Sequence, residues 1–303
     1  MFDVRRQGSP RIESGAGYTS RGGWMPELPE VEIMCRNLAR WSLGRPLCQV
    51  DVVDSAVDSG GVEEWARKAR GRTVGRVWRR GKYAVVELAD AEHSLVLHFR
   101  MTGKLVAADP ERRSSVRIIL RLAPEAGRPD CLVFDDARRL GNAWALATAE
   151  LQDWFETSRK LGPEPWPVHR PAAFWASQLG SIRSPIKVAL MRQDRVAGLG
   201  NIAASEILWR AGVSPTRQAC SLSLEQWDRL AAAVPAFITD TIEREGGDEI
   251  AYVNSRGASS HGNPSPFSVY RCDGQPCPRC RAPIERFKQS GRSTFWCAAC
   301  QEG

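Results

Sequence analysis

The chain has 303 residues, a formal net charge of +7, 43% hydrophobic residues and 25% charged residues. This length allows two domains with separate cores, the composition is that of a globular protein, and no apolar run approaches the roughly 20 residues of a membrane span. The positive charge favours a polyanionic partner such as nucleic acid, although a mildly basic enzyme without such a partner has the same balance.

Residues 1–24 are rich in glycine, serine and arginine and show no hydrophobic periodicity. They lack the apolar core of a secretory signal peptide. We interpret them as an unstructured or wrongly annotated N-terminal extension. A disordered tail, a targeting segment and a gene model extended upstream are the alternatives.

The stretch from Met25 to Glu32 begins the first predicted helix. Proline is tolerated in a first helical turn, and acidic side chains favour the positive end of the helix dipole. Apolar residues then recur at helical spacing, which predicts a helix over 30–41 that ends near Gly44-Arg45-Pro46.

Pro26 allows a second, chemical interpretation of the same stretch. If translation starts at Met25 and this methionine is removed, Pro26 carries a secondary amine at the N-terminus, beside the carboxylates of Glu27 and Glu30. A terminal amine has a pKa of about 7.7–8, against about 10.4 for lysine, so a neutral, nucleophilic fraction exists at pH 7. The neighbouring carboxylates can move protons.

Short strands separated by turn residues follow, which is typical of antiparallel sheets packed as a sandwich. They are predicted at 47–53, 73–78, 83–88, 94–99, 115–122 and 131–134, with a short helix at 63–69. The segment from Arg67 to Lys82 holds eight basic residues and no acid. A solvated basic face and a surface that follows phosphates explain this run equally well.

The segment Leu161–Pro167 is dense in proline and predicts a hinge between two domains. The sequence beyond it has helical spacing, and helices are predicted at 174–179, 184–193, 202–211, 224–242 and 248–253. Gly198-Leu199-Gly200-Asn201-Ile202 precedes one of these helices, where main-chain amides form a natural phosphate site. Residues 243–266 have the composition of a mobile loop.

Two Cys-x-x-Cys pairs near the C-terminus give the strongest physical signal in the sequence. Cys277 and Cys280 are separated by sixteen residues from Cys297 and Cys300. Four thiolates at this spacing suit one tetrahedral structural Zn²⁺ and leave no open position for a substrate. Residues 284–287 and 294–296 between the pairs predict a hairpin. The other five cysteines have no framework spacing, which indicates a reducing compartment.

The N-terminal stretch from Met25 resembles the N-terminus of the formamidopyrimidine-DNA glycosylase and endonuclease VIII family, and further motifs follow in the family's order. These motifs lie at 80–83, 98–103, 135–141, 161–165, 196–206 and 277–300. The resemblance therefore covers nearly everything from Met25 to Cys300. It implies an α+β fold, with an N-terminal antiparallel β-sandwich flanked by helices and a C-terminal helix–two-turn–helix domain that ends in a zinc-finger hairpin.

The resemblance also implies a domain organisation. A catalytic β-sandwich domain would span 25–155, and a hinge linker would span 156–167. A DNA-binding helix–two-turn–helix domain over 168–266 and a zinc finger over 267–303 would complete the chain.

The chemistry that the resemblance implies is base-excision repair at Pro26. The protein would flip an oxidised base out of duplex DNA, and the Pro26 amine would attack C1′ while Glu27 protonates the sugar ring oxygen. The Schiff base then permits β- and δ-elimination, and Glu30 supports proton transfer. Lys82 and Arg292 complete the implied catalytic set.

The resemblance implies DNA contacts from two loops and from the second domain. Met101 would fill the gap left by the flipped nucleotide, and Arg138 would reach the orphaned base. Leu140, which replaces the family's phenylalanine, would wedge between base pairs. The other DNA-binding residues implied by these motifs are His98, Asn201, Tyr270 and Arg292.

Two alternatives remain open. Leu140, Ala203 and Asp273 depart from the family pattern, so an endonuclease VIII-type preference for oxidised pyrimidines competes with 8-oxoguanine and formamidopyrimidines. The protein is instead a non-catalytic binder of damaged DNA if residues 1–24 are retained, because the Pro26 nitrogen is then an amide.

The expected partner is double-stranded DNA that contains oxidised bases or abasic sites, and the expected cofactor is one structural Zn²⁺. We expect a monomer with no membrane association. The expected location is the bacterial cytoplasm, at the DNA of the nucleoid.

Overall fold

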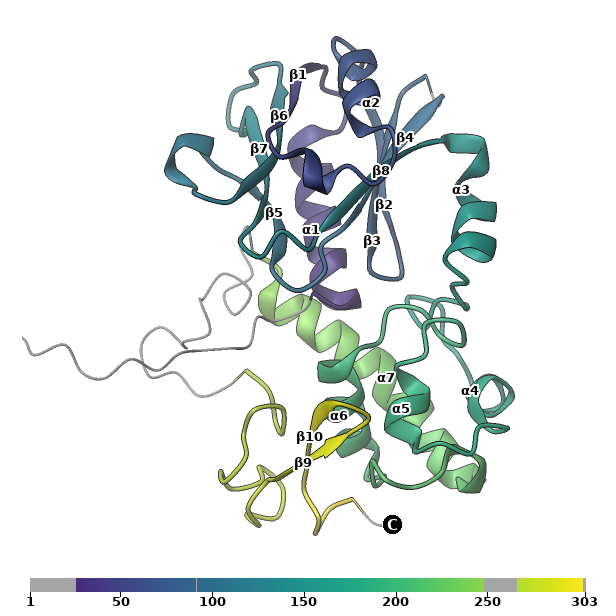
Figure 1. Cartoon of the computed structure of the whole chain (residues 1–303). Coiled ribbons are helices and arrows are strands. Elements are labelled where there is room, and N and C mark those ends of the chain that lie inside the picture. The colour runs from purple at the N-terminus through teal and green to yellow at the C-terminus, as the bar shows by residue number, and fades with distance from the viewer. Residues whose placement is uncertain (1–25, 91, 248–265, 302–303) are drawn as a thin grey trace, which may run out of the picture.

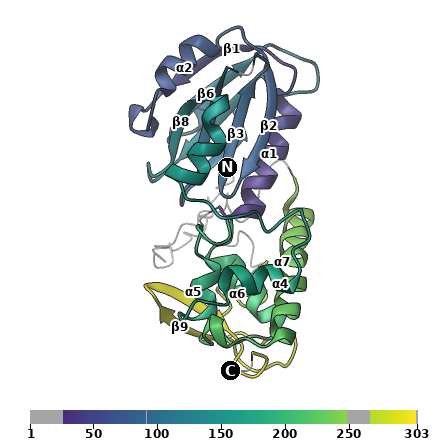
Figure 2. The ribbon, with the colours of Figure 1, turned by 90° about the vertical axis from the view of Figure 1, so that its right-hand side faces the viewer.

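The computed structural model describes residues 26–90, 92–247 and 266–301. These residues form two bodies, one above the other, in both views (Figure 1, Figure 2). The β-sandwich body comprises residues 26–90 and 92–147, and the helical body comprises residues 161–247 and 266–301. None of the helices in the described part of the chain combines the length and the hydropathy needed to cross a bilayer.

The β-sandwich body contains two four-stranded antiparallel sheets. The first has the order β1 (Leu47–Val52), β6 (Val116–Leu122), β7 (Cys131–Asp136) and β5 (Gly103–Ala107). The second has the order β2 (Val74–Arg80), β3 (Tyr83–Leu88), β4 (His93–His98) and β8 (Asn142–Ala147). Buried side chains of both sheets share one core, so the predicted sandwich is confirmed.

Helix α1 (Leu28–Ser42) packs against β2, β3 and β5 through its buried apolar face. It starts two residues earlier than predicted, because Pro29 suits the first turn and Glu30 accepts a hydrogen bond from the Glu27 amide at 2.7 Å. The short helix α2 (Val62–Ala69) contacts β1 and β8. Both predicted helices are therefore present.

Strands β5 and β8 were not predicted. β8 has the sequence Asn-Ala-Trp-Ala-Leu-Ala, and alanine and asparagine have a low preference for strands. Its pairing with β4 along the whole strand makes it extended. β5 follows a turn directly and pairs with β7, with Leu105 opposite Phe134. Tertiary pairing thus decides the conformation of both segments.

The connection between the bodies begins with α3 (Leu151–Asp153) and a helical turn at Trp154–Ser158. The helical body then contains four helices within the described residues. These are α4 (Ala172–Leu179), α5 (Ile186–Leu190), α6 (Asn201–Ala211) and α7 (Leu224–Glu245).

Helix α7 extends from the helical body to α1, and Asn37 of α1 donates a hydrogen bond to the Gly247 carbonyl at 2.9 Å (Figure 1). The helix runs through Glu245, so residues 243–245 of the mobile loop expected at 243–266 are helical, and most of that segment lies outside the described residues. α5 is shorter than expected. The helix expected at 248–253 lies outside the described residues.

A hairpin of β9 (Glu285–Gln289) and β10 (Arg292–Trp296) closes the chain, as predicted. Ser290 and Gly291 form its two-residue turn with φ values of 48° and 77°. Positive φ at both positions is the requirement of a type I′ turn, which matches the twist of the paired strands. β10 packs against α6, and Arg292, the first residue of β10, is exposed.

Candidate functional site

Glu27 connects the two bodies. Its carboxylate accepts hydrogen bonds from the main-chain amides of Ile202 (2.9 Å) and Ala203 (3.0 Å), in the first turn of α6. The side chain is 3% exposed. These amides were predicted as a phosphate site, and the helix dipole does bind an anion here. The anion is the carboxylate of Glu27, from 175 positions earlier in the chain.

Gly200 permits this contact because it has no side chain. A Cβ atom at this position would lie 2.3 Å from the Glu27 carboxylate carbon and 2.7 Å from the Lys82 Nζ atom. Leu28 strengthens the same junction, since its amide donates to the Gly198 carbonyl at 3.1 Å. The glycine-rich turn thus binds the N-terminal stretch by close packing and a main-chain hydrogen bond.

Pro26 and Glu30 lie next to Glu27, and both are buried. The Glu30 carboxylate orients the backbone of Glu27 through the 2.7 Å hydrogen bond to its amide. Pro26 is the first described residue. The predicted pair of carboxylates, Glu27 and Glu30, follows it in the chain. The groups before Pro26 lie outside the described residues.

Lys82 lies on the turn between β2 and β3 and is 9% exposed. Burial lowers the pKa of Lys82, the nearby Glu27 and Glu30 carboxylates oppose this shift, and the charge of Arg292 adds to it. The structure therefore brings predicted residues from both ends of the chain into one electrostatic group.

Lys187 on α5 is a buried residue that the sequence reasoning missed. Its Nζ atom donates to the Asn201 Oδ1 atom (2.7 Å), the Thr294 hydroxyl (2.8 Å) and the Ser293 carbonyl (3.1 Å). Burial lowers the pKa of Lys187 to about 8, Glu27 opposes this, and Arg292 adds to it. The available clue was a single lysine inside the apolar segment Ile-Lys-Val-Ala-Leu.

Asn201 begins α6, and its side chain is held on two sides. Its Oδ1 atom accepts from Lys187, and its Nδ2 atom donates to the Ser293 carbonyl at 3.1 Å. Tyr270 lies beside it, and burial raises the pKa of the Tyr270 hydroxyl while the hydrogen bond with Asn201 lowers it. Phosphate binding by these two residues stays a prediction.

Glu206 fixes the chain segment that carries Tyr270. Its carboxylate, 2% exposed, accepts from the amides of Ser268 (3.0 Å), Val269 (2.8 Å) and Tyr270 (2.9 Å). Tyr270 also packs edge-on against Phe295 of β10, with ring centroids 5.0 Å apart. One buried acid on α6 thereby sets the position of the tyrosine.

His98 ends β4 and is largely enclosed. Its ring packs edge-on against Tyr83 at 4.5 Å, and its Nδ1 atom accepts from the Arg100 amide at 3.2 Å. Burial and the charges of Arg100 and Lys82 lower the pKa of His98 to about 3, so the ring is neutral at pH 7. A DNA contact by His98 stays a prediction.

Met101, Arg138 and Leu140 lie on two adjoining loops of the β-sandwich body. The Arg138 guanidinium is 3.7 Å from the Met101 sulfur, and Leu140 is 42% exposed. Arg139 differs from Arg138, because it has a φ of 55° and its guanidinium pairs with Asp54 at 2.7 Å. The structure thus leaves Arg138, but not Arg139, beside Met101.

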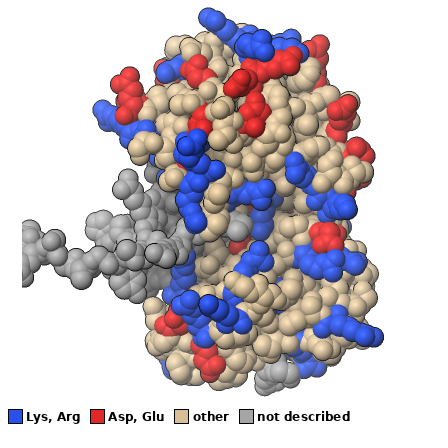
Figure 3. Space-filling view, viewed as in Figure 1, with Lys and Arg blue, Asp and Glu red and all other residues tan. Residues whose placement is uncertain are grey.

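The basic run from Arg67 to Lys82 is not one phosphate-binding face. Arg79 is 4% exposed and pairs with Glu32 and Glu164, and Arg80 also pairs with Glu164. The ion pairs with Glu164 attach the end of β2 to the first residues of the helical body. Lysine and arginine side chains from both bodies do surround the hollow between them (Figure 3).

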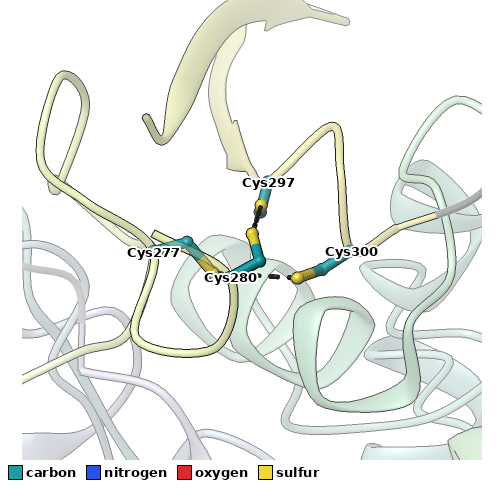
Figure 4. A group of neighbouring side chains, drawn as sticks. All are labelled: Cys277, Cys280, Cys297 and Cys300. Carbon is teal, nitrogen blue, oxygen red and sulfur yellow. Dashed lines mark hydrogen bonds between the residues drawn. The ribbon is translucent and has the colours of Figure 1, made fainter. Parts of the chain in front are cut away.

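The four predicted metal ligands converge beyond β10 (Figure 4). All four sulfur atoms lie within 4.8 Å of one another, and two of the separations are 3.8 Å and 3.4 Å. A tetrahedron with Zn–S bonds of about 2.3 Å has sulfur atoms about 3.8 Å apart. Cys277, Cys280, Cys297 and Cys300 therefore fit one metal ion.

Comparison with known proteins decides the family. Residues 25–143 match the model of the formamidopyrimidine-DNA glycosylase N-terminal domain, residues 161–251 the model of the H2TH domain of that glycosylase, and residues 274–303 the model of the zinc finger found in FPG and IleRS. The chain belongs to the formamidopyrimidine-DNA glycosylase family. The predicted family, fold class and zinc finger are thereby confirmed.

Members of the family from several bacteria align over most of their length. The formamidopyrimidine-DNA glycosylase of Chloroflexus aurantiacus is 34% identical over 278 residues, which cover 91% of this chain and 98% of that protein. The protein of the same name from Moorella thermoacetica is 38% identical over 267 residues, or 87% of this chain and 95% of that protein.

Solved structures of the family agree with the fold. The Lactococcus lactis Fpg in complex with DNA that contains an abasic site has a TM-score of 0.79 and 29% identity, and the match covers 91% of this chain and 100% of that chain. The complex of the Lactococcus lactis Fpg with DNA that contains FAPY-dG has a TM-score of 0.79 and 28% identity, over 91% and 100%.

Proposed function

We propose that this member of the family excises oxidised purines, such as 8-oxoguanine and formamidopyrimidines, from duplex DNA and then cuts the strand, with the Pro26 amine as nucleophile. Glycosylase and AP lyase activity are general properties of the family. One observation carries the assignment to Pro26. Glu27, the next residue, joins both bodies at the α6 amides, and its charge and that of Arg292 both act on the buried Lys82.

The proposed reaction begins when neutral Pro26 attacks C1′ of the damaged nucleoside. The Glu27 carboxylate takes the proton that the attacking amine releases and delivers it to the ring oxygen, so the C1′–O bond of the ring breaks. The base then leaves with the electron pair of its bond to C1′ as the iminium forms. The iminium acidifies the C2′ protons, so β-elimination and then δ-elimination break the two phosphate ester bonds. Glu30, which accepts a hydrogen bond from the Glu27 amide, orders water and supports proton transfer.

The remaining residues bind DNA in this proposal. Lys82, Asn201, Arg292 and Tyr270 hold phosphates near the flipped nucleotide, and their grouping around α6 and β10 supports this role. Met101, Arg138 and Leu140 fill the gap, reach the orphaned base and separate base pairs, while His98 supports their loop. The four cysteines would hold one Zn²⁺, which stabilises the finger that carries Arg292.

Borohydride trapping tests the nucleophile. A protein that begins at Met25 is incubated with duplex DNA containing 8-oxoguanine, and reduction is expected to leave a covalent protein–DNA adduct. The matched control is the 303-residue chain, in which the Pro26 nitrogen is an amide and forms no iminium. Absence of an adduct with the shorter protein contradicts the proposal.

The lesion preference has its own test. Excision from duplexes carrying 8-oxoguanine, formamidopyrimidine or thymine glycol is expected to be faster for the two purine lesions. Faster release of thymine glycol favours the endonuclease VIII-type alternative, for which the leucine at position 140 is the relevant departure. Intact mass of the native protein separates a terminus at Pro26 from a retained extension that permits binding only.

We further propose that the protein acts as a monomer on the nucleoid DNA of the bacterial cytoplasm. The support is its DNA-repair family and the basic side chains around the hollow between the bodies. The proposed units are 25–155, the hinge 156–167, 168–266 and 267–303. Sedimentation of the protein alone is expected to show one chain, and a dimer contradicts this.

A further inference from the structure

The carboxylate of Asp136, 1% exposed, organises the loop that carries Arg138 and Leu140. Its Oδ2 atom accepts from the amides of Leu140 (2.8 Å) and Gly141 (2.6 Å), and its Oδ1 atom lies 3.3 Å from the Arg138 amide. These are all hydrogen bonds within one loop.

Thr102 adds a link from the neighbouring loop. Its hydroxyl donates to the Oδ1 atom of Asp136 and accepts from the Arg138 amide at 3.1 Å. The Thr102 hydroxyl is thus hydrogen-bonded both to the Asp136 carboxylate and to the main chain of Arg138. Met101, the residue before Thr102, touches the Arg138 side chain.

The residues around this link are closely packed and hydrogen-bonded. The Asp136 carbonyl accepts two hydrogen bonds from the Arg117 guanidinium, at 3.0 and 2.7 Å. Gly103 pairs with Asp136 in the sheet, and a Cβ atom on Gly103 would lie 2.4 Å from the Phe99 carbonyl oxygen. Asp136 and Gly103, the neighbours of this link, are thus held by hydrogen bonds and close packing, while Arg138 and Leu140 are exposed and Met101 is half-buried.

We propose that Thr102 is a positioning residue that couples the methionine loop to the arginine loop, so that the gap-filling side chain and the opposite-base probe act as one unit. This inference rests on the proposed function. Hydrogen bonds to charged acceptors are stronger than neutral ones, and a buried carboxylate that loses one donor is left incompletely paired. Loss of the hydroxyl lets the two loops move independently.

The hydrogen bonds of Thr102 are separate from those that hold the proposed catalytic residues. The hydrogen bonds that hold Glu27 and Lys187 involve α6, β10 and the residues around them, not these two loops. The expected effect therefore falls on recognition of the lesion and of the base opposite it.

The test compares Thr102→Val, which keeps the side-chain shape but removes the hydroxyl, with Thr102→Ser, which keeps the hydroxyl. Single-turnover excision of 8-oxoguanine opposite cytosine is expected to fall about tenfold in T102V, and the ratio of the rates opposite cytosine and opposite adenine is expected to move toward one. T102S is expected to restore both. Thr157→Val is the matched control, since the Thr157 hydroxyl bonds only within its own helical turn, to Asp153.

A second measurement does not depend on catalysis. Hydrogen exchange at the amides of Arg138, Leu140 and Gly141 is expected to accelerate in T102V and to stay at the parent rate in T102S and T157V. If T102V keeps the exchange rates and the opposite-base preference of the parent, the proposal that Thr102 couples the two loops is wrong. Failure of the parent Met25-initiated protein to cleave abasic DNA overturns the proposed function instead, and the exchange rates then still decide the coupling.

Discussion

At the scale of single residues, the site combines charges that the fold has largely removed from water. Glu27, Lys82 and Lys187 are all nearly or fully buried, and each has polar or charged neighbours. Burial costs the charged form of a lysine more than the neutral form, which lowers its pKa. Lys187 illustrates this best, because its three hydrogen-bond partners are all neutral groups.

The depressed pKa of Lys187 predicts a pH dependence of stability. The pKa is about 8 in the folded protein, against an ordinary value of 10.5 for lysine. Below pH 8 Lys187 is protonated in both the folded and the unfolded protein, and the folded protein bears the full free-energy cost of burying its charge. Between about pH 8 and 10.5 only the unfolded chain binds it, so the free energy of unfolding rises with pH, by at most about 1.4 kcal/mol per unit.

Urea unfolding of the parent and of Lys187→Met at pH 7, 8 and 9 measures this contribution. The difference in unfolding free energy, parent minus variant, is expected to be constant up to pH 8 and to rise above it. Because both proteins share every other titrating group, the difference isolates Lys187. Parallel curves throughout this range contradict the prediction.

At the scale of elements, α6 organises the site. The amides of its first turn bind Glu27, Asn201 at its start contacts Lys187 and β10, and Glu206 in its middle anchors the Tyr270 segment. At its other end, Arg279 of the finger donates to the carbonyls of Trp209 and Arg210 at 2.8 and 3.0 Å. Side-chain donors commonly satisfy the last carbonyls of a helix in this way.

Gly200→Ala tests the close approach at the start of α6. Gly200 has a φ of −136°, which alanine adopts without strain, so the effect comes from the clash with Glu27 and Lys82. We expect a loss of about 1–3 kcal/mol in unfolding free energy and loss of the borohydride adduct with abasic DNA. Gly60→Ala is the control, since its Cβ atom would make only an ordinary contact at 3.5 Å. Equal behaviour of the two variants contradicts the assignment.

At the scale of the whole molecule, three sets of contacts among the described residues contribute to holding the two bodies together. They are the Glu27–α6 contact, the packing of α1 on α7, and the ion pairs of Glu164 with Arg79 and Arg80. The finger reaches the same centre, because Ser293 and Thr294 of β10 bind Lys187. Loss of the metal is therefore expected to weaken DNA binding without unfolding the β-sandwich body.

Cys280→Ala tests whether loss of the metal weakens DNA binding while the β-sandwich body stays folded. With three thiolates left, the zinc content is expected to fall from one per chain to well below one, and affinity for abasic-site DNA to fall at least about tenfold. Hydrogen exchange in β3 and β4 is expected to stay at the parent rate. Cys220→Ala is the matched control, because Cys220 is exposed and lies outside the cluster. Full zinc content in C280A contradicts the ligand assignment.

The sequence by itself determined the features whose chemistry is local. The spacing of the cysteine pairs predicted the metal cluster, the alternating segments predicted most strands of the sandwich, and the motifs in their order identified the family. Each of these follows from residues near one another in the chain, so that neighbours alone specify the structure.

Only the tertiary structure decided which groups meet. It placed Glu27, rather than an external phosphate, on the amides of α6, it turned Lys187 from one more helical lysine into a buried cation, and it made β8 a strand by pairing it with β4. Residues such as Thr102 and Asp136 look ordinary in sequence. Their bonding depends on two loops that meet because β5 and β7 are neighbours in the sheet, and the local sequence contains no record of that pairing.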